Sequence, residues 1–175
     1  MSLASEILDI ASKRHIMIAT AESCTGGMVV AALTDIPGSS AVVERGFVTY
    51  TNTAKTEMLG VSPATLAAHG AVSEAVAGEM ATGALVHAPV QLTVSITGIA
   101  GPGGSEFKPE GRVCFGVADA NHVHTETVEF GALGRDAVRA AAVDHALQMI
   151  LHSIRQDTHE SEANRRGNAQ DLRSF

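Results

Sequence analysis

Apolar residues recur with helical or strand-like spacing along most of the chain. The helical period near the N-terminus predicts an amphipathic helix over residues 2–14, and its apolar positions are Leu3, Ile7, Ile10 and Ala11. Short runs rich in apolar and β-branched residues predict strands at residues 16–20, 44–51, 90–97, 112–120 and 122–130. The last of these alternates polar and apolar residues, as a half-exposed outer strand does.

Capping residues and prolines divide the helical pattern into separate helices. One helix follows Gly26 and Gly27 and ends before Pro37. Further starts are expected at Asn52 or Thr53, at Ser62 before Pro63, and at Ser73, and a long helix is expected over residues 134–155. Residues 156–175 are polar and nearly free of apolar side chains, so we expect a disordered tail there.

The alternation of helices and strands predicts the α/β class, with a three-layer architecture. The chain has 175 residues, which is long enough to bury a sizeable core. We therefore expect a single domain over residues 1–155, followed by the polar tail at 156–175.

Composition narrows the classes of partner. The formal net charge is −7, from 12 Lys and Arg against 19 Asp and Glu, which argues against a broad nucleic-acid surface. The two cysteines, Cys24 and Cys114, form no CxxC pair, so we expect a reducing cytoplasm. The N-terminus lacks the pattern of a signal peptide, and no apolar stretch reaches the ~18 residues of a membrane span.

The first candidate site is Glu22-Ser23-Cys24-Thr25-Gly26-Gly27, between a predicted strand and a predicted helix. One interpretation is structural, with Ser23 or Thr25 capping the helix. The other is chemical, with Ser23 as a nucleophile and helix-start amides that stabilise an oxyanion. Cys24 is a second candidate nucleophile, but no histidine lies nearby in the sequence, and a small buried thiol is the commoner outcome.

The second candidate is Lys55, in the stretch Thr49–Lys55. A lysine at a helix start opposes the helix dipole, which favours anions there. A partly buried lysine can lose its proton and act as a general base, whereas the plainer interpretation is a solvated surface lysine. Tyr50, in the same stretch, is the only tyrosine of the chain.

Two further segments are suited to an anionic ligand. The loop Ser95–Gly104 is rich in glycine, which lets backbone amides approach a ligand, although it matches neither the P-loop nor the dinucleotide fingerprint. Arg135 and Arg139 are four residues apart near a helix start, where they either grip a phosphate or carboxylate or remain solvated. His122 and His124 share one strand face but have no third ligand nearby, so we expect no metal site.

Taken together, five ordered blocks resemble the CinA C-terminal domain family of competence/damage-inducible proteins, whose standalone form is a nicotinamide-nucleotide amidohydrolase. The blocks are TAESCTGG, GFVTYTNTAKTEMLGV, HGAVSEAVAGEMATGA, SITGIAGPGGSEFKPEGRVCFG and RDAVRAAAVDHAL. The resemblance covers residues 2–151. It implies a three-layer α/β/α sandwich around a mixed, mostly parallel sheet, and dimers or higher homo-oligomers.

The resemblance also implies hydrolysis of the carboxamide of nicotinamide mononucleotide, without a metal or redox cofactor. Ser23 is then the nucleophile, Lys55 its base and Tyr50 a residue that orients the pair or helps with proton transfer, which is a Ser–Lys variant of the catalytic triad. The remaining implied residues hold the oxyanion or the substrate, and they are Glu22, Cys24, Thr25, Gly26, Gly27, Thr97, Gly98, Gly101, Gly103, Gly104, Arg135 and Arg139.

The chain departs from the family pattern at one corner of this expected site. The family often has Gly-Asp-Arg before the last helix, whereas this chain has Leu133-Gly134-Arg135-Asp136. Two other hypotheses remain open from the sequence. One is a non-catalytic module that binds a nucleotide, and the other is an amidase that acts on another small amide.

Overall fold

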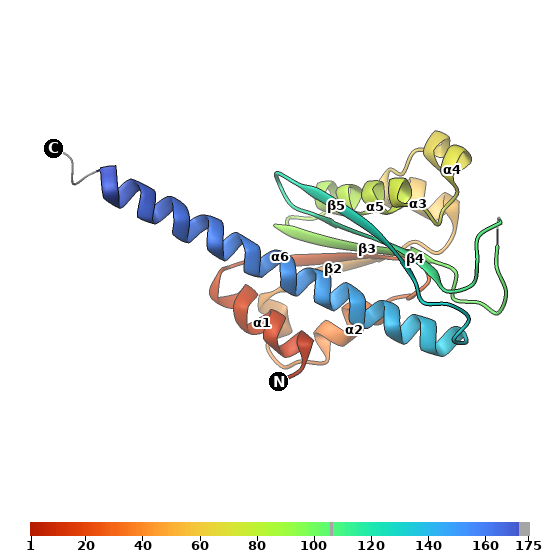
Figure 1. Ribbon diagram of the computed structural model, residues 1–175, viewed down its shortest axis with the longest axis horizontal. Coiled ribbons are helices and arrows are strands. Elements are labelled where there is room, and N and C mark those ends of the chain that lie inside the picture. The colour runs from red at the N-terminus through yellow and green to blue at the C-terminus, as the bar shows by residue number, and fades with distance from the viewer. Residues whose placement is uncertain (106, 172–175) are drawn as a thin grey trace.

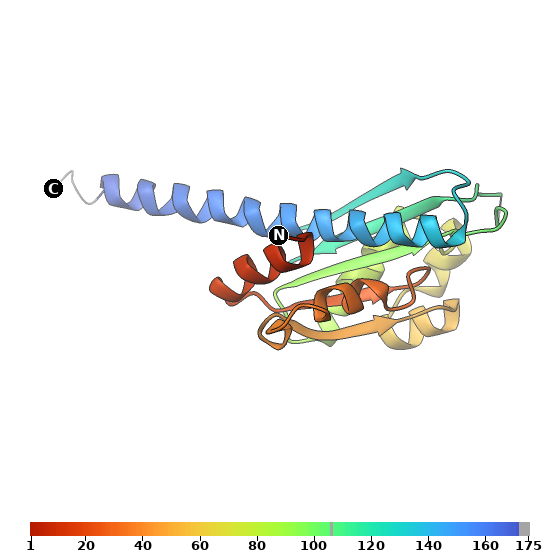
Figure 2. The ribbon, with the colours of Figure 1, turned by 90° about the horizontal axis from the view of Figure 1, so that it is seen from below.

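The computed structural model describes residues 1–105 and 107–171, with side chains described up to residue 156. Five strands form one mixed sheet in the order β2-β1-β3-β4-β5 (Figures 1 and 2). Their bounds are Ile18–Glu22 for β1, Val43–Val48 for β2, Leu92–Gly98 for β3, Arg112–Ala118 for β4 and Val123–Glu129 for β5. β1 pairs in parallel with both β2 and β3, while β4 is antiparallel to β3 and β5. Four strands therefore point one way and β4 points the other.

Helices cover both faces of the sheet, which confirms the three-layer α/β/α architecture (Figure 1). On one face lie α1 (Leu3–Lys13), α2 (Met28–Thr34) and α6 (Arg135–Asp171). On the other lie α3 (Asn52–Leu59), α4 (Pro63–His69) and α5 (Glu74–His87). A short 3-10 turn, η1 (Ser39–Ala41), precedes β2.

Side-chain caps fix where the helices begin. The hydroxyl of Ser62 accepts from the amide of Ala64, with Pro63 at the first helical position, and the hydroxyl of Ser73 accepts from the amide of Val76. Both starts agree with the sequence prediction. The cap of α3 is Thr51 rather than Asn52 or Thr53, because its hydroxyl accepts from the amide of Ala54.

Burial divides the apolar residues between the two sides of the sheet. The larger cluster includes Ile7, Val29, Phe115 and Ile150 and joins α1, α2 and α6 to the sheet. The smaller cluster lies under α3 and α5 around Leu59 and Met80. β1 and β3 are buried along almost their whole length. Their sequences are therefore apolar runs with buried hydroxyls and do not alternate between apolar and polar residues.

Most strand ends differ from the sequence prediction by one to three residues, as at β2, which ends at Val48 rather than at residue 51, and two differences change the interpretation. The strand predicted at 16–20 lies at Ile18–Glu22, so Glu22 belongs to the strand itself. α6 continues to Asp171, into the segment that we expected to be disordered (Figure 1). A helix that is already formed extends at little cost, and this segment contains no proline to end it. The last four positions of the predicted tail, 172–175, lie outside the described residues.

Candidate functional site

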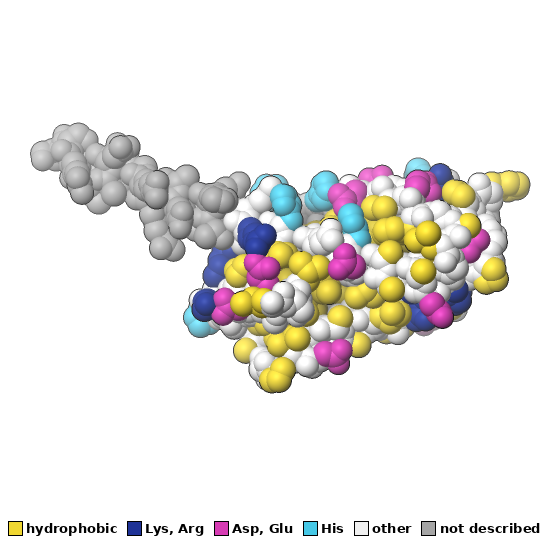
Figure 3. All heavy atoms as spheres, turned by 60° about the horizontal axis from the view of Figure 1, so that its bottom comes forward, with side chains coloured by type: hydrophobic (Ala, Val, Ile, Leu, Met, Phe, Trp, Pro, Cys, Tyr) yellow, Lys and Arg dark blue, Asp and Glu magenta, His cyan; other side chains and the backbone are white. Residues whose placement is uncertain are grey.

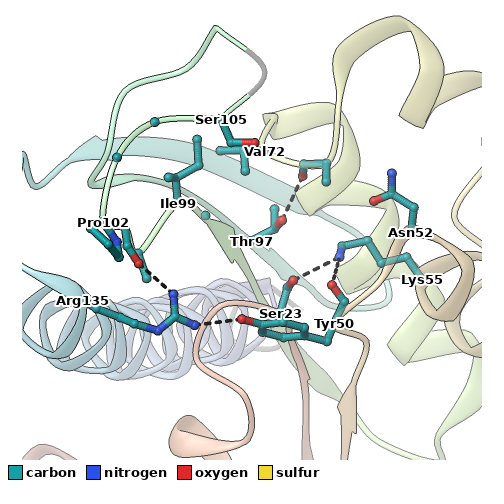
Figure 4. Close-up of a pocket in the computed structure, with 16 residues that line it drawn as sticks. Ser23, Tyr50, Asn52, Lys55, Val72, Thr97, Ile99, Pro102, Ser105 and Arg135 are labelled. Carbon is teal, nitrogen blue, oxygen red and sulfur yellow. Dashed lines mark hydrogen bonds between the residues drawn. The ribbon is translucent and has the colours of Figure 1, made fainter.

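The Ser23 turn and the end of β3 border a pocket of about 330 Å³ (Figure 4). β1 and β3 are parallel neighbours with Glu22 opposite Ile96, so both strands end at the same edge of the sheet. Ligands of open α/β sheets bind at that edge. The pocket is lined by Ser23, Tyr50, Asn52, Lys55, Ala71, Val72, Thr97, Gly98, Ile99, Ala100, Gly101, Pro102, Gly103, Gly104, Ser105 and Arg135.

Lys55 and Ser23 meet at this pocket although they are far apart in the sequence. The distance from Lys55 Nζ to Ser23 Oγ is 3.0 Å, and both side chains are buried, with Lys55 only 1% exposed. Figure 4 shows the lysine reaching from α3 toward the serine. A nucleophile within hydrogen-bonding distance of a buried amine is the geometry of a Ser–Lys pair.

The surroundings of Lys55 disfavour its charged form. Nζ also donates to the backbone carbonyls of Thr49 at 2.9 Å and of Tyr50 at 3.5 Å. Burial lowers the pKa of Lys55, because the ammonium loses its hydration. Among the residues that the structure describes, no carboxylate forms an ion pair with this lysine. Its position near the start of α3 adds an unfavourable helix dipole.

Glu22, directly before Ser23, is buried but turns away from the pocket. Its carboxylate accepts hydrogen bonds from the hydroxyls of Thr20 at 3.1 Å and Thr25 at 2.7 Å. It also accepts from the amides of Val29 at 2.9 Å and Val30 at 3.1 Å in the first turn of α2. The N-cap residue of α2 is therefore Gly27 rather than Ser23 or Thr25, which the sequence suggested, and the Glu22 carboxylate supplies the acceptors for the first amides of the helix and holds the Ser23 turn without lining the pocket.

Cys24 is part of the larger apolar cluster rather than of the pocket lining. Burial raises the pKa of its thiol to about 11. The thiol is therefore protonated near neutral pH, and a protonated thiol is a poor nucleophile. This environment favours Ser23 over Cys24 as the nucleophile.

Two of the amides expected to hold an oxyanion remain open for that role. The amide of Ser23 donates to Ile96 and that of Gly26 to Ser23 itself. Within the described part of the chain, the amides of Cys24 and Thr25 have no hydrogen bond to another residue. The amide of Gly27 likewise has none in this part of the chain, so Cys24 and Thr25 are the two such donors that directly follow Ser23 and could stabilise negative charge beside it.

The two arginines that sequence spacing grouped together have different places. Arg139 does not line the pocket: its Nε donates to the carbonyl of Cys24 at 3.0 Å, and Nη2 donates to that of Thr25 at 3.4 Å. Arg135 does line it (Figure 4). The structure therefore leaves Arg135 as the arginine at the pocket.

Gly27, another residue that the resemblance implied for the site, is the N-cap residue of α2, with φ of 102°.

Tyr50 contacts the pair through its backbone rather than its ring. Its carbonyl faces Lys55, while its hydroxyl accepts a hydrogen bond from Arg135 Nη2 at 2.8 Å. Arg135 Nη1 also donates to the carbonyl of Gly101 at 2.8 Å. Figure 4 shows Tyr50 and Arg135 together at one side of the pocket. A chain of contacts thus joins Lys55, Tyr50, Arg135 and the glycine-rich loop.

The glycine-rich loop supplies one wall, and its backbone is only partly available to a ligand. Gly98, Gly101, Gly103 and Gly104 line the pocket as the sequence suggested, with Thr97 in its floor. The amide of Gly103, however, donates to Glu110 at 3.1 Å. The expected nest of free amides is therefore incomplete at this position.

Sequence reasoning missed a second wall, which comes from the segment between α4 and α5. The residues concerned are Ala71 and Val72, and Asn52 of α3 also borders the pocket. Nothing in the local sequence marks small apolar residues as ligand-facing. Asn52 was recognised only as a possible cap, because a cap and a pocket residue share the same polarity.

The histidines lie elsewhere. His124 Nε2 donates to the Glu126 carboxylate at 3.1 Å, and His145 also contacts Glu126. In the part of the chain that the structure describes, no group of three His, Cys, Asp or Glu side chains is placed to hold a metal ion. Over the same residues, no helix is both long and apolar enough to cross a membrane.

Comparison with known proteins places the chain among close relatives. The family model of the CinA C-terminal domain matches residues 1–154. Nicotinamide-nucleotide amidohydrolase PncC of Escherichia coli strain K12 is 50% identical over 159 residues, which cover 90% of this chain and 96% of that protein.

Solved structures of other proteins are also similar to this chain. The competence/damage inducible protein CihA of Agrobacterium tumefaciens is 48% identical with a TM-score of 0.84, covering 87% of this chain and 93% of that one. A CinA superfamily protein of Klebsiella pneumoniae 700603 is 35% identical with a TM-score of 0.85, covering 88% of this chain and 96% of that one.

Proposed function

This chain belongs to the CinA C-terminal domain family, and we propose that it is an amidohydrolase that converts nicotinamide mononucleotide to nicotinic acid mononucleotide and ammonia. The observation that carries the proposal is the 3.0 Å contact between Ser23 Oγ and the buried Nζ of Lys55. The PncC relative, named for this activity, aligns over nearly the whole of both chains and supports the choice of substrate.

The contacts of Lys55 suit a neutral amine. A neutral amine has two N–H bonds and one lone pair. The carbonyls of Thr49 and Tyr50 can only accept, so they take the two N–H bonds. The lone pair then faces Ser23, whose hydroxyl can donate to it. This arrangement orients the base toward the proton that it must remove.

Acylation begins when Ser23 Oγ attacks the carboxamide carbon and its proton passes to Lys55 Nζ. The carbonyl oxygen of the substrate becomes an oxyanion, for which the amides of Cys24 and Thr25 are the available donors. The tetrahedral intermediate then collapses, the C–N bond breaks, and Lys55 gives its proton to the departing ammonia. The nicotinoyl group remains as an ester on Ser23.

Deacylation repeats the sequence with water as the nucleophile. Lys55, neutral again, takes a proton from water as its oxygen attacks the ester carbon. Collapse of the second intermediate returns that proton to Ser23 Oγ and releases the carboxylic acid product, which ionises in solution. The same base serves both halves, so each half begins with a neutral Lys55.

The phosphate of the substrate is assigned to the side of the pocket where Arg135 lies. Arg135 uses one N–H on Gly101 and one on Tyr50, which leaves donors of its guanidinium for an anion. Tyr50 holds that guanidinium in place, so its proposed role is to position Arg135. This differs from the role of orienting the Ser–Lys pair that the resemblance implied, and Arg139 is assigned no phosphate contact.

The activity is tested by following ammonia release from nicotinamide mononucleotide. The wild-type protein is expected to turn over, and Ser23→Ala is expected to lose at least about 10³-fold in kcat because no acyl-enzyme can form. Circular dichroism of the variant checks that it is folded. Equal turnover by Ser23→Ala, or none by the wild type, would contradict the proposal. Turnover of another small amide alone would retain the chemistry and change the substrate.

The cellular setting is proposed from the family rather than from the pocket. The family and the PncC relative support a place in pyridine nucleotide salvage in the cytoplasm. The net charge of −7 supports the further proposal of no nucleic-acid partner, and we propose no membrane partner. Figure 3 shows hydrophobic side chains gathered on the face formed by α1, α2 and α6, where Leu3, Ile10, Ala32, Ile36 and Val143 are partly exposed. A second copy covering this face would form a homo-oligomer. A monomeric mass by light scattering would contradict that assignment.

A further inference from the structure

Two segments remote in sequence form the side of the pocket opposite Ser23. One is the stretch 69–72, which runs from the last residue of α4 toward α5 and contributes Ala71 and Val72. The other is the glycine-rich loop, which contributes the lining up to Ser105. Figure 4 shows Val72 and Ser105 next to one another across the pocket from Ser23. Whatever joins these two segments sets the shape of the pocket on this side.

Residue 69 ends α4 and residues 70–72 have no regular structure, so the carbonyls of this stretch have no helical partner and depend on other groups for hydrogen bonds. All four of its carbonyls accept from a side chain. Ser73 donates to the carbonyl of Gly70 at 2.9 Å, and Thr97 donates to that of Ala71 at 2.9 Å. Lys108 Nζ donates to the carbonyls of His69 at 2.5 Å and Val72 at 2.6 Å.

Lys108 is the donor that comes from the opposite segment. Ser73 follows the stretch directly and Thr97 lines the pocket from β3, whereas Lys108 lies beyond the glycine-rich loop, in the same connection between β3 and β4. Its ammonium therefore bridges the two segments with two hydrogen bonds. Both carbonyls lie at the C-terminal end of α4 or just beyond it, where the helix dipole favours a positive charge.

The backbone of Lys108 is fixed to the pocket lining on its own side. Ser105 and Lys108 form an isolated β-bridge, with N···O distances of 3.0 Å and 2.8 Å. Gly104 packs so closely on this turn that a Cβ there would lie 2.4 Å from the Lys108 carbonyl. A shift of Lys108 is therefore transmitted to Gly104 and Ser105, which line the pocket.

The charge of Lys108 serves this bridge rather than an ion pair. Among the described residues, no carboxylate forms a salt bridge with it. Charge-assisted hydrogen bonds to two carbonyls are stronger and more directional than neutral ones. Lys13, by comparison, pairs with Asp9 on the surface of α1, far from the pocket lining.

We propose that Lys108 is a positioning residue whose ammonium holds the stretch 69–72 against the glycine-rich loop and so sets the fit of the pocket to its substrate. The residue contacts no reacting atom. Its effect is on binding in the ground state and the transition state alike, which raises KM when it is lost and leaves kcat nearly unchanged. The identity of that substrate rests on the proposed function.

The test compares Lys108→Met, which keeps the stem and loses the ammonium, with Lys108→Arg and with Lys13→Met. Lys108→Met is expected to raise KM for nicotinamide mononucleotide about tenfold while kcat changes less than about threefold. Lys108→Arg, which keeps the charge and its donors, is expected to recover most of the loss. Lys13→Met is expected to match the wild type.

Amide hydrogen exchange supplies a readout that needs no substrate. Lys108→Met is expected to speed exchange in residues 69–73 and 101–111 and to leave β1 and β3 unchanged. This measurement decides the proposal even when the wild type releases no ammonia, which would defeat the proposed function alone. Unchanged exchange in both segments would overturn the bridge. A fall in kcat with no change in KM would overturn the assigned role.

If Lys108→Met does not fold, Lys108→Gln provides the second variant, since a neutral amide can still donate to one carbonyl. Its exchange and KM are expected to lie between those of the wild type and of a protein lacking the bridge. Values equal to those of the wild type in both measurements would overturn the proposal.

Discussion

Glu22 and Lys55 are both ionisable side chains buried next to Ser23, but the groups that surround them differ. The Glu22 carboxylate accepts four hydrogen bonds, two from hydroxyls and two from amides at the start of α2. The helix dipole favours its negative charge there. Lys55 is 1% exposed, forms no ion pair with a described carboxylate, and lies near the start of a helix, where the dipole opposes its charge.

The difference separates a structural charge from a reactive one. A buried charge costs several kcal/mol unless hydrogen bonds and dipoles replace its hydration. Around Glu22 this replacement is complete, so the carboxylate holds the Ser23 turn in place. Lys55 has hydrogen-bond acceptors around Nζ but neither a carboxylate partner nor a favourable dipole, and burial lowers its pKa, which shifts the balance toward the neutral amine. A general base at neutral pH needs this second environment, which stabilises the reactive form at the expense of the protonated one.

The largest expected effect is on activity, through Lys55→Met. Loss of the base is expected to lower kcat by about 10³-fold, within the range usual for general base catalysis. The rate of ammonia release measures it, with Lys13→Met as a control for the same side-chain replacement at a surface position. Retention of more than about a tenth of the wild-type rate would show that another group removes the Ser23 proton.

The same lysine makes a stability prediction with a definite sign. Folding lowers its pKa, so between the lowered value and the ordinary value of about 10.4 the unfolded chain binds more protons than the folded one. The free energy of unfolding therefore rises with pH through this window. Wild type is expected to gain stability relative to Lys55→Met as the pH rises from neutral to about 10, as measured by urea unfolding. Parallel curves for the two proteins would mean that the lysine pKa is not lowered.

A smaller effect, on stability rather than on base strength, is expected from Glu22→Gln. The amide keeps the size of the side chain but replaces one acceptor oxygen with a donor, which then faces groups that also donate. We expect a loss of about 2–3 kcal/mol in the free energy of unfolding, the range for hydrogen bonds to a charged group. Chemical denaturation near pH 7 measures it.

The pH dependence of Glu22→Gln separates the structural role of Glu22 from the role of Lys55 as the base. Its kcat at saturating substrate is expected to fall through distortion of the Ser23 turn, while the pH at which the rate rises stays that of the wild type, because Lys55 is untouched. A shift of that midpoint, with no change in stability, would make Glu22 part of the proton transfer and would remove the contrast between the two residues.

The sequence predicted the helices and strands that carry Glu22 and Lys55 better than the contacts that the two side chains make. The architecture and most elements followed from apolar periodicity and caps such as Ser62 and Ser73, because these are local signals. The pairing of Ser23 with Lys55 required the family resemblance. Neither residue is marked by its neighbours, and their contact depends on β1 and α3 meeting at one end of the sheet.

Side-chain direction is what the sequence could not supply. Glu22 and Ser23 are adjacent, yet one faces α2 and the other the pocket, because successive residues at the end of a strand point to opposite sides. Arg135 and Arg139 share a helical face by spacing, but only Arg135 borders the pocket. The stretch 69–72 became a wall through contacts with Thr97 and Lys108, which no local pattern records.

The smallest expected effect comes from Thr20→Val, which tests whether the four donors around Glu22 act separately. Thr20 lies fully buried on β1, and its hydroxyl donates to Glu22 Oε2 at 3.1 Å. Valine keeps the branched shape and removes this one donor, so we expect a loss of about 1 kcal/mol in the free energy of unfolding. Because Oε2 still accepts from Val30, the Ser23 turn is expected to stay in place and kcat to remain within about twofold of the wild type. Urea unfolding and ammonia release measure the two quantities. A loss as large as that of Glu22→Gln would mean that the donors act as one cooperative network rather than as independent bonds.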